Sequence, residues 1–423
     1  MRRSMVVFAV LGAAAVLAVA SCGSGSGTST TDSAGGPSTS SGEASDSTAN
    51  SSSDGASTEA GESSGSKTVD LSAASAALRD AGYDQIADSV DKAAPAPATL
   101  KDGSTFKLKD SIAKKLASGE KVNYVFSYQS SGIALFSDQY KTGYDATVPI
   151  AQTVLPTMNA SAIAPSGDID VQTQISQIEA LYNTNQIDCL GLEPPDSDAF
   201  TDITNKLMAD GIPVFTAGVT SNGNEFSNFT QVPMEEGHQA AQVVLDWMKS
   251  TDHDLKVFTT SGGDPGSFWG QGRMKGFEEG IKAAIPDAKF INTADNPLTV
   301  NYDPAQAYDT YKALLTGNPD LQFVLNVDIT AEQAFKAIQD LGRVGKVFTA
   351  GWNVSVGQLD AIDAGVQVVA FDQGWPQQAG FGAVACAVYL ATGDVIPNAQ
   401  HLVPVTSENS AEARKDLAKI LGG

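Results

Sequence analysis

Aromatic residues recur directly after the predicted strands of this chain, where their rings could line a cleft and stack on a small ligand. Aromatic residues are few, 7% of the sequence, and those that follow predicted strands are Phe136, Phe268, Trp269, Tyr302, Trp352 and Trp375. A core aromatic normally lies inside a helix or strand, whereas rings on loops at strand ends suit the lining of a cleft. Packing within those loops is the alternative interpretation, because a sequence does not reveal burial.

Signals of catalysis are weak. The pattern G-x-S-x-G occurs at 61–65, but in a low-complexity stretch with no predicted strand or helix beside it. The glycines around 270–276 match a phosphate loop only loosely, and helix packing explains them better. No two of the three histidines have the spacing of metal ligands. They are His238, His253 and His401. We therefore predict no enzyme activity, no metal and no cofactor.

The stretch 187–219 has the pattern that would position such ligand-binding groups. An apolar run at 187–192 and a β-rich run at 212–216 flank a predicted helix, and this order is typical of a βαβ unit in a parallel sheet. Ligands of open α/β sheets lie outside the carboxyl ends of the strands, so Glu193 and Gly218 are predicted at the ligand edge.

Predicted strands and helices alternate from residue 121 onward. Asp196 and Ser197 are predicted to cap the helix of the βαβ unit. The other predicted strands are 122–127, 256–260, 290–293, 323–326, 346–350 and 366–371. The other predicted helices are 134–144, 171–182, 234–248, 272–284, 304–315, 331–341, 357–364 and 376–392. This alternation predicts an α/β fold with parallel sheets, and the number of elements is too large for one compact sheet. A small helical prefix at 67–118, of unknown role, precedes them.

The first 66 residues have the composition of export and tether segments. Residues 1–21 carry Arg2 and Arg3 before an apolar run and a small-residue cleavage context, as in a signal peptide. A retained anchor helix is the alternative, but the run is somewhat shorter than the ~20 residues of a spanning helix. Residues 23–66 are almost wholly small or acidic, which predicts a disordered tether.

Charge and cysteine content bear on partners and stability. The formal net charge of −23 would repel a phosphate backbone, so nucleic acid is not expected as a partner. Besides Cys22, the sequence contains only Cys189 and Cys386. We favour two buried thiols, and a disulfide between them stays open because an exported protein permits one.

Several motifs, in order from residue 121 to the end, carry a family resemblance. They are G-L-E-P-P-D-S-D-A-F at 191–200, G-I-P-V-F-T at 211–216, G-R-M-K-G-F at 272–277, N-P-D-L-Q-F-V at 318–324 and F-D-Q-G-W-P-Q-Q-A-G at 371–380. The chain thereby resembles the periplasmic sugar-binding proteins of ABC importers, the ribose-binding type. The resemblance implies two Rossmann-like lobes with parallel sheets, joined by three crossover hinge segments around a ligand cleft. We expect one lobe at 119–230 plus 373–394 and the other at 231–372 plus 395–423.

The resemblance also implies particular ligand contacts. Phe136 and Tyr302 are similar to the stacking aromatics of the family, and Arg273 to an arginine whose planar fork pairs with two ligand oxygens, although a structural arginine is the alternative. Asn353 stands where ribose binders carry an aspartate, and Gln373 resembles their hinge glutamine. The predicted ligand-binding residues are Tyr128, Gln129, Phe136, Glu193, Gly218, Trp269, Arg273, Tyr302, Asn353, Gln373 and Trp375.

The departures from the ribose binders concern the ligand itself. Glu193 replaces an asparagine, Gly218 and Val219 replace an adjacent acid and arginine, and Val327 replaces an asparagine before Asp328. A buried polar ligand needs partners for its polar groups, so ribose held in the usual way is not expected. A ligand with fewer hydroxyls near Gly218, or a bulkier one, fits better.

The prediction is a solute-binding protein that captures a small neutral carbohydrate or polyol for an ABC permease. The sequence V-A-S-C at 19–22 resembles the bacterial lipoprotein signal, which implies lipidation of Cys22 and anchoring to the outer face of the cell membrane. We expect a monomer. A surface sensor that signals to a chemoreceptor or kinase is the alternative, and an exported enzyme ranks last.

Overall fold

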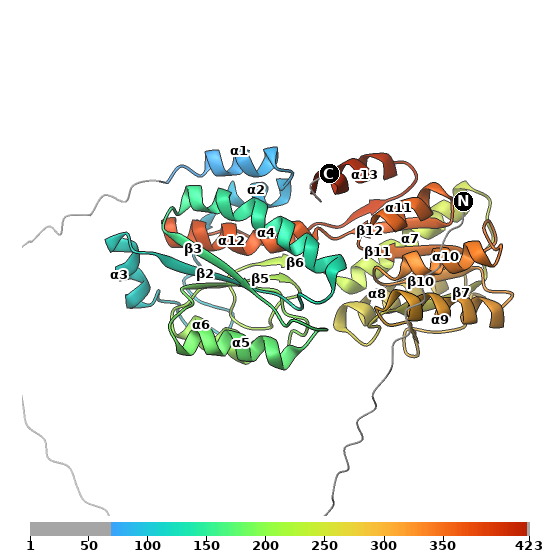
Figure 1. Ribbon diagram of the computed structural model, residues 1–423, viewed down its shortest axis with the longest axis horizontal. Helices are drawn as coiled ribbons and strands as arrows, with labels where there is room; N and C mark the ends of the chain where they lie inside the picture. The colour runs from blue at the N-terminus through green and yellow to red at the C-terminus, as the bar shows by residue number, and fades with distance from the viewer. Residues whose placement is uncertain (1–68, 421–423) are drawn as a thin grey trace, which may run out of the picture. The chain divides into compact units, whose positions relative to one another are not determined.

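A computed structural model describes residues 69–420, apart from the side chains of Leu135, Phe136, Lys419 and Ile420. The predicted signal peptide, Cys22 and the whole predicted tether therefore lie outside the described residues. No helix within 69–420 is both long enough and apolar enough to cross a membrane. The described chain forms an α/β fold with two large sheets, each in its own lobe, and one small two-stranded sheet, which confirms the predicted fold class (Figure 1).

The first lobe is built on a five-stranded parallel sheet in the order β3-β2-β4-β5-β6. The strands are β2 (Val122–Ser127), β3 (Met158–Ile163), β4 (Cys189–Leu192), β5 (Val214–Gly218) and β6 (Asn228–Thr230). Helices α4 (Ala134–Val154) and α12 (Trp375–Thr392) cover one face, and α5 (Val171–Asn183) and α6 (Thr201–Ala209) cover the other (Figure 1). Because both faces are covered, β4 and β5 are buried throughout, as their apolar runs predicted.

The second lobe has a seven-stranded sheet, parallel except for its antiparallel edge strand β14. Its strands are β7 (Val257–Gly262), β8 (Lys289–Phe290), β9 (Leu298–Thr299), β10 (Phe323–Asn326), β11 (Phe348–Trp352), β12 (Gln367–Asp372) and β14 (Val403–Val405). Its helices are α7 (Pro233–Ser250), α8 (Phe268–Ala284), α9 (Pro304–Gly317), α10 (Ala331–Asp340), α11 (Val356–Asp363) and α13 (Ser410–Ile420).

The chain passes between the lobes along three connections, as the resemblance implied. They follow β6, β12 and the short strand β13 (Asp394–Val395). Gly374, between β12 and α12, has a φ of 65°, a left-handed conformation that glycine adopts at little cost. These connections place the carboxyl ends of both parallel sheets next to the same interlobe space.

The helical prefix is an integral part of the first lobe. It forms α1 (Ser72–Asp80), α2 (Asp84–Val90), the short strand β1 (Ala94–Pro95), which pairs with β13, and α3 (Asp110–Ser118). Leu78 and Ile86 are fully buried and belong to the same hydrophobic cluster as β2 and α12. The prefix therefore completes the core instead of forming a separate unit.

Some sequence-based element boundaries were wrong. Strand β3 was missed because only Met158 is buried along it, so it lacks the apolar run of a central strand. The helix predicted from the caps Asp196 and Ser197 begins at Thr201 instead. Asp196 accepts a hydrogen bond from the amide of Ala199, 2.9 Å away, and so closes a turn before the helix.

The aromatic residues assigned to loops also need correction. Phe268 and Trp269 form the first turn of α8, and Trp352 ends strand β11. Trp352 is fully buried and stacks on Phe371, with ring centroids 5.0 Å apart. It is therefore a core residue and not a cleft-lining one.

Cys189 and Cys386 form a disulfide, contrary to the favoured interpretation of two free thiols. Cys189 begins the central strand β4, and Cys386 lies in α12, which packs directly across that strand. Their Cα atoms are 6.0 Å apart, a normal spacing for a bridge. The sequence could not supply this distance, because 197 residues separate the two cysteines.

Candidate functional site

A small cavity lies between the two lobes at the carboxyl ends of their strands. It encloses about 50 Å³, which is room for several water molecules, since one needs ~10–15 Å³ by this measure. Both lobes and the connections between them line it. The lining residues are Gln129, Tyr140, Ile169, Glu193, Pro194, Gly218, Val219, Gln231, Trp269, Arg273, Tyr302, Asp328, Ile329, Asn353, Gln373 and Trp375. A space of this size suits one compact ligand.

Glu193 presents a buried carboxylate to the cavity from the end of β4. Its carboxylate accepts hydrogen bonds from the backbone amide of Gln129, 3.1 Å away, and from the Gln129 side-chain amide. Burial raises the pKa of the Glu193 carboxyl to about 7, and the hydrogen bonds from Gln129 and Tyr140 oppose that rise. The side chain therefore titrates near neutral pH and can accept or donate a hydrogen bond.

Gly218 keeps space open beside Glu193. Its φ is 71°, and an added Cβ would lie 3.3 Å from both Gln378 Oε1 and Glu193 Oε1. A side chain at this position would be strained and would crowd the carboxylate. The departure from an acidic residue at 218 thus leaves an uncharged wall, continued by Val219.

Arg273 lines the cavity from α8, but protein groups already occupy its guanidinium. Its Nε donates to Glu236, 2.7 Å away, and one terminal nitrogen donates to the carbonyl of Val327 at 2.9 Å. The other terminal nitrogen donates to Gln373 and, at 3.4 Å, to Gln231. In this arrangement the arginine is chiefly a structural group, the alternative that the sequence left open.

Two indole rings hold the Arg273 guanidinium in place. Its Cζ lies 5.2 Å from the ring centroid of Trp269 and 5.0 Å from that of Trp352. Such contacts stabilise a desolvated cation. The buried Trp352 thus contributes to the site indirectly, by positioning Arg273.

Gln373 and Asn353 join the hinge to the second lobe. Gln373 accepts from Arg273 and donates to Asn353 Oδ1, so both ends of its amide are engaged. Asn353 has a φ of 67°, a left-handed conformation that asparagine tolerates better than most residues. Gln378 of α12 donates to the Gln373 carbonyl, 2.9 Å away. A continuous chain of hydrogen bonds therefore runs from α8 through the hinge to the first lobe.

Tyr302 and Ile329 reach across the interlobe space. Both come from loops of the second lobe, yet they pack against the hydrophobic core of the first lobe. Trp375, at the start of α12, lies in the same cluster and is 6.1 Å from Tyr140 between ring centroids. The two lobes are thus in contact around the cavity, with aromatic rings on several sides.

Asp328 supplies a second buried carboxylate. It accepts hydrogen bonds from the Gly263 amide at 2.6 Å and from the amide and hydroxyl of Thr330 at 2.9 and 2.8 Å. Burial raises the pKa of Asp328, while these donors and the charge of Arg273 oppose the rise. The cavity lining therefore carries two acidic side chains and one arginine that is already paired with Glu236.

The structure brings most of the predicted ligand-binding residues to one cavity. Those that line it are Gln129, Glu193, Gly218, Trp269, Arg273, Tyr302, Asn353, Gln373 and Trp375. Tyr128 is half-buried behind Tyr140, with ring centroids 5.7 Å apart, and does not line the cavity. Phe136 lies in α4, but its side chain is outside the described part of the structure.

The sequence-based set missed several lining residues. Tyr140 lies in α4 four residues after the predicted Phe136, a spacing of about one helical turn that could have indicated it. Asp328 lies two residues after the end of β10, much as Glu193 follows β4, and could have been found by the same rule. Pro194, next to Glu193, could have been found in the same way, whereas Gln231 and Ile169 had no such signal, because the strands β6 and β3 before them were not predicted from the sequence.

The arrangement favours binding over catalysis. Aromatic rings and polar groups converge on one enclosed space, the usual composition of a small-molecule site. Among residues 69–420, no three His, Cys, Asp or Glu side chains are clustered so that they could hold a metal ion. Glu193 and Asp328 accept hydrogen bonds from amides and hydroxyls that fix the positions of the two carboxylates. These contacts suit the recognition of a hydroxylated ligand.

A scan against protein-family models independently supports a role in ligand binding. The model described as "Periplasmic binding protein domain" matches residues 125–394, which is more than half of the chain. The chain belongs to the periplasmic binding protein family. Members of this family bind solutes for transporters and are not enzymes, so the prediction of no enzyme activity is confirmed.

Solved structures of this family share the fold at low sequence identity. The Caulobacter myo-inositol binding protein, bound to myo-inositol, is 20% identical, with a TM-score of 0.59 over 70% of this chain and 97% of that chain. A carbohydrate transporter solute binding protein from Agrobacterium radiobacter, in complex with D-arabinose, is 17% identical, with a TM-score of 0.59 over 71% and 99%. A carbohydrate transporter from Acidothermus cellulolyticus, in complex with myo-inositol, is 19% identical, with a TM-score of 0.58 over 71% and 99%. No curated protein sequence matches the chain.

Proposed function

We propose that this protein is the solute-binding component of an ABC importer and that it binds a compact sugar or cyclitol between its lobes. The observation that carries the proposal is the interlobe cavity, whose lining combines the aromatic residues Trp269, Tyr302 and Trp375 with two buried carboxylates. Ring faces stack on the apolar faces of a sugar, and carboxylates accept hydrogen bonds from its hydroxyls. The inositol and sugar ligands of the similar structures support the same chemical class.

Closure of the lobes is the signal that the permease would recognise. A ligand that contacts Glu193 in one lobe and Asn353 in the other binds the closed form better than the open form. It can shift the equilibrium only by that difference in affinity. The ligand is released unchanged to the permease.

A thermal-shift panel tests the ligand class. The purified full chain is heated with pentoses, hexoses, linear polyols and inositols, and a ligand that binds only the native state raises the Tm. A concentration-dependent rise with one chemical family supports the proposal. No rise with any member contradicts it.

We further propose that the mature protein is anchored to the outer face of the cell membrane through a lipidated Cys22. The support is the V-A-S-C sequence at 19–22, followed by a long Ser/Gly-rich stretch. Metabolic labelling of expressing bacteria with an alkyne fatty acid should label the wild type and not a Cys22→Ala variant. Equal labelling of the two proteins would exclude this anchor.

A further inference from the structure

A second cavity, the outer cavity, shares part of its lining with the inner one. It encloses about 240 Å³, and Val219 and Gln231 line both cavities. Gln231 donates its backbone N–H to the Gly218 carbonyl, 2.7 Å away, so the shared wall is part of the first connection between the lobes. A ligand in the inner cavity therefore has the outer space as its immediate neighbour.

The outer cavity has an aromatic platform on one side. Phe268 begins α8 and is 57% exposed, the most exposed large hydrophobic side chain of the described residues. Exposure of an aromatic ring to water is unfavourable, and covering the ring with a flat apolar surface lowers the free energy. A ligand ring could therefore stack with its face on the Phe268 ring.

Polar groups of the first lobe stand on the other side. The Asn222 side-chain amide donates to Asp198, 2.8 Å away, and accepts from the Thr220 hydroxyl at 3.2 Å. Asp198 is exposed, and its other carboxylate oxygen receives no hydrogen bond from the part of the chain that the structure describes. These groups can accept hydrogen bonds from the hydroxyls of a ligand and donate hydrogen bonds to them.

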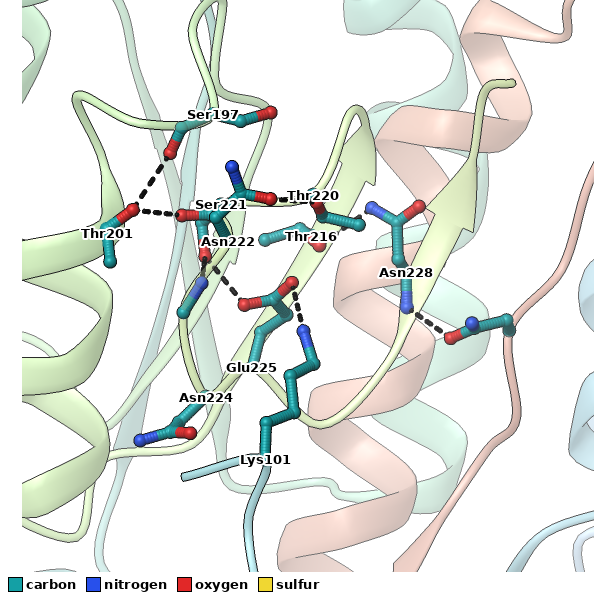
Figure 2. A network of polar contacts seen from close by, with 12 residues as sticks. Lys101, Ser197, Thr201, Thr216, Thr220, Ser221, Asn222, Asn224, Glu225 and Asn228 are labelled. Atoms are coloured by element: carbon teal, nitrogen blue, oxygen red, sulfur yellow. Dashed lines mark hydrogen bonds and ion pairs between the residues drawn. The ribbon is translucent and has the colours of Figure 1, made fainter. Parts of the chain in front are cut away.

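Asp198, Thr220 and Asn222 form a polar wall, and hydrogen bonds behind it hold it rigid. Asn222 has a φ of 52°, and Thr201 donates to the Ser221 carbonyl, 2.9 Å away, which ties the loop to the start of α6. Beneath it, Ser221 donates to the buried Glu225 at 2.6 Å (Figure 2). A preformed wall of this kind lowers the entropy cost of binding.

The helical prefix supplies the anchor of this wall. Lys101 donates to Glu225, 2.7 Å away, as Figure 2 shows, and Asn224 donates to Asp102 at 2.7 Å. The side chain of Glu225 is only 1% exposed, so Lys101 compensates a charge that would otherwise be costly to bury. The prefix thus supports the loop that forms one side of the outer cavity.

From these contacts we infer that the outer cavity is a subsite for a second ring, so that the ligand is a glycoside or another ring-substituted sugar or cyclitol. The inference rests on the proposed function, because the first ring occupies the inner cavity. That cavity is too small for two rings. The second ring stacks on Phe268, and its hydroxyls face Asp198, Thr220 and Asn222.

Matched ligand pairs test this subsite by titration calorimetry on the purified full chain. The pairs are glucose with cellobiose and with maltose, galactose with melibiose, and myo-inositol with galactinol. For at least one pair we expect the glycosylated member to bind about 3- to 10-fold more tightly, the gain of one ring contact. Phe268→Ala should abolish that gain and leave the affinity of the single-ring member unchanged, whereas Phe268→Trp should retain it.

Controls separate the subsite from other roles of Phe268. Val344→Ala alters another exposed apolar residue, 48% exposed and remote from both cavities, and should change neither affinity. Equal effects of Phe268→Ala on both members of a pair would overturn the subsite, as would binding of single-ring ligands only. Unchanged binding with loss of uptake would overturn it in favour of a permease contact. No binding of any sugar or cyclitol would overturn the subsite together with the proposed function.

Discussion

At the scale of single residues, the protein places an unusual acid at its ligand site. Glu193 stands where the resemblance led us to expect an asparagine, and it is buried with amide and hydroxyl donors around it. An acid in this setting is destabilising when it is charged, since burial penalises the charged form. Glu193 therefore lowers the stability of the folded protein near neutral pH, while its carboxylate provides a stronger hydrogen-bond acceptor than an asparagine side chain.

Replacement of Glu193 should remove a pH dependence of stability. The pKa of this carboxyl is raised from 4.5 to about 7 on folding, so the folded state binds the proton more tightly than the unfolded state. The free energy of unfolding then falls as the pH rises from 4.5 to about 7 and levels off above. Relative to Glu193→Gln, we expect the wild type to lose about 2–3 kcal/mol between about pH 5 and pH 8. Urea unfolding at several pH values measures this, and parallel curves for the two proteins would contradict it.

Arg273 and Glu236 should behave as a buried ion pair. Each side chain is 1% exposed, so Arg273→Met leaves an uncompensated buried carboxylate and should cost about 3–5 kcal/mol of unfolding free energy. The double variant Arg273→Met with Glu236→Gln should recover part of that loss. Arg414→Met, which breaks an exposed pair with Asp360 and Asp363, should cost under about 1 kcal/mol. If Arg273→Met and Arg414→Met lowered the free energy of unfolding in urea by similar amounts, Arg273 and Glu236 would not behave as a buried ion pair.

Without the family resemblance, the sequence indicated individual site residues only near the ends of strands. Glu193 and Gly218 follow β4 and end β5, so the rule for parallel sheets located them. The same rule misplaced Trp352, because it says that a residue lies at a strand end and not which face the side chain takes. The occupied hydrogen bonds of Arg273 could not be predicted either, since its partners come from three segments that are distant in the sequence.

At the scale of elements, the disulfide joins a central strand to the helix that crosses it. Alanine at both Cys189 and Cys386 should lower the free energy of unfolding by about 2–4 kcal/mol, because the bridge closes a long loop. The wild type should lose a similar amount when unfolded with a reductant present, and the double variant should not respond to the reductant. A wild type that is equally stable with and without the reductant would contradict this account.

The prefix elements should contribute to the core of the first lobe. Leu78 of α1 is fully buried, so Leu78→Ala should cost about 2–5 kcal/mol. Leu71, just before the same helix, is only partly buried, and Leu71→Ala should cost clearly less. Chemical unfolding should show one cooperative transition for each variant. A separate early transition in Leu78→Ala would show instead that the prefix folds on its own.

Sequence patterns predicted elements in proportion to their burial. The strand 122–127 was predicted with the boundaries that the structure shows, because its residues are buried on both faces. The edge strand β3 was missed because only one of its residues is buried, and β6 and β14 were missed because three residues each are too few to show a pattern. The long helix α4 was predicted only in its first half, because Pro149 and several β-branched residues weaken the signal further along.

At the scale of the whole molecule, two lobes and three connections produce a site that neither lobe contains alone. The first lobe brings Glu193 and Gly218, the second brings Arg273 and Asn353, and the hinge brings Gln373. Ordered motifs along the sequence predicted this architecture, because four of them lie within one lobe each and the motif at 371–380 spans the connection from β12 to α12. They did not predict the outer cavity, which depends on how Phe268 and Asn222 face each other across the cleft.

The most direct test of the account is the affinity of the full chain for the sugar or cyclitol that gives the largest thermal shift. Titration calorimetry should show one binding site per chain. Trp269→Ala removes a ring that lines the inner cavity, and it should weaken that binding about 10-fold or more. The remote variant Val344→Ala should leave the affinity unchanged. If the Trp269→Ala and Val344→Ala variants bound the ligand equally tightly, the assignment of the interlobe cavity as the ligand site would be contradicted.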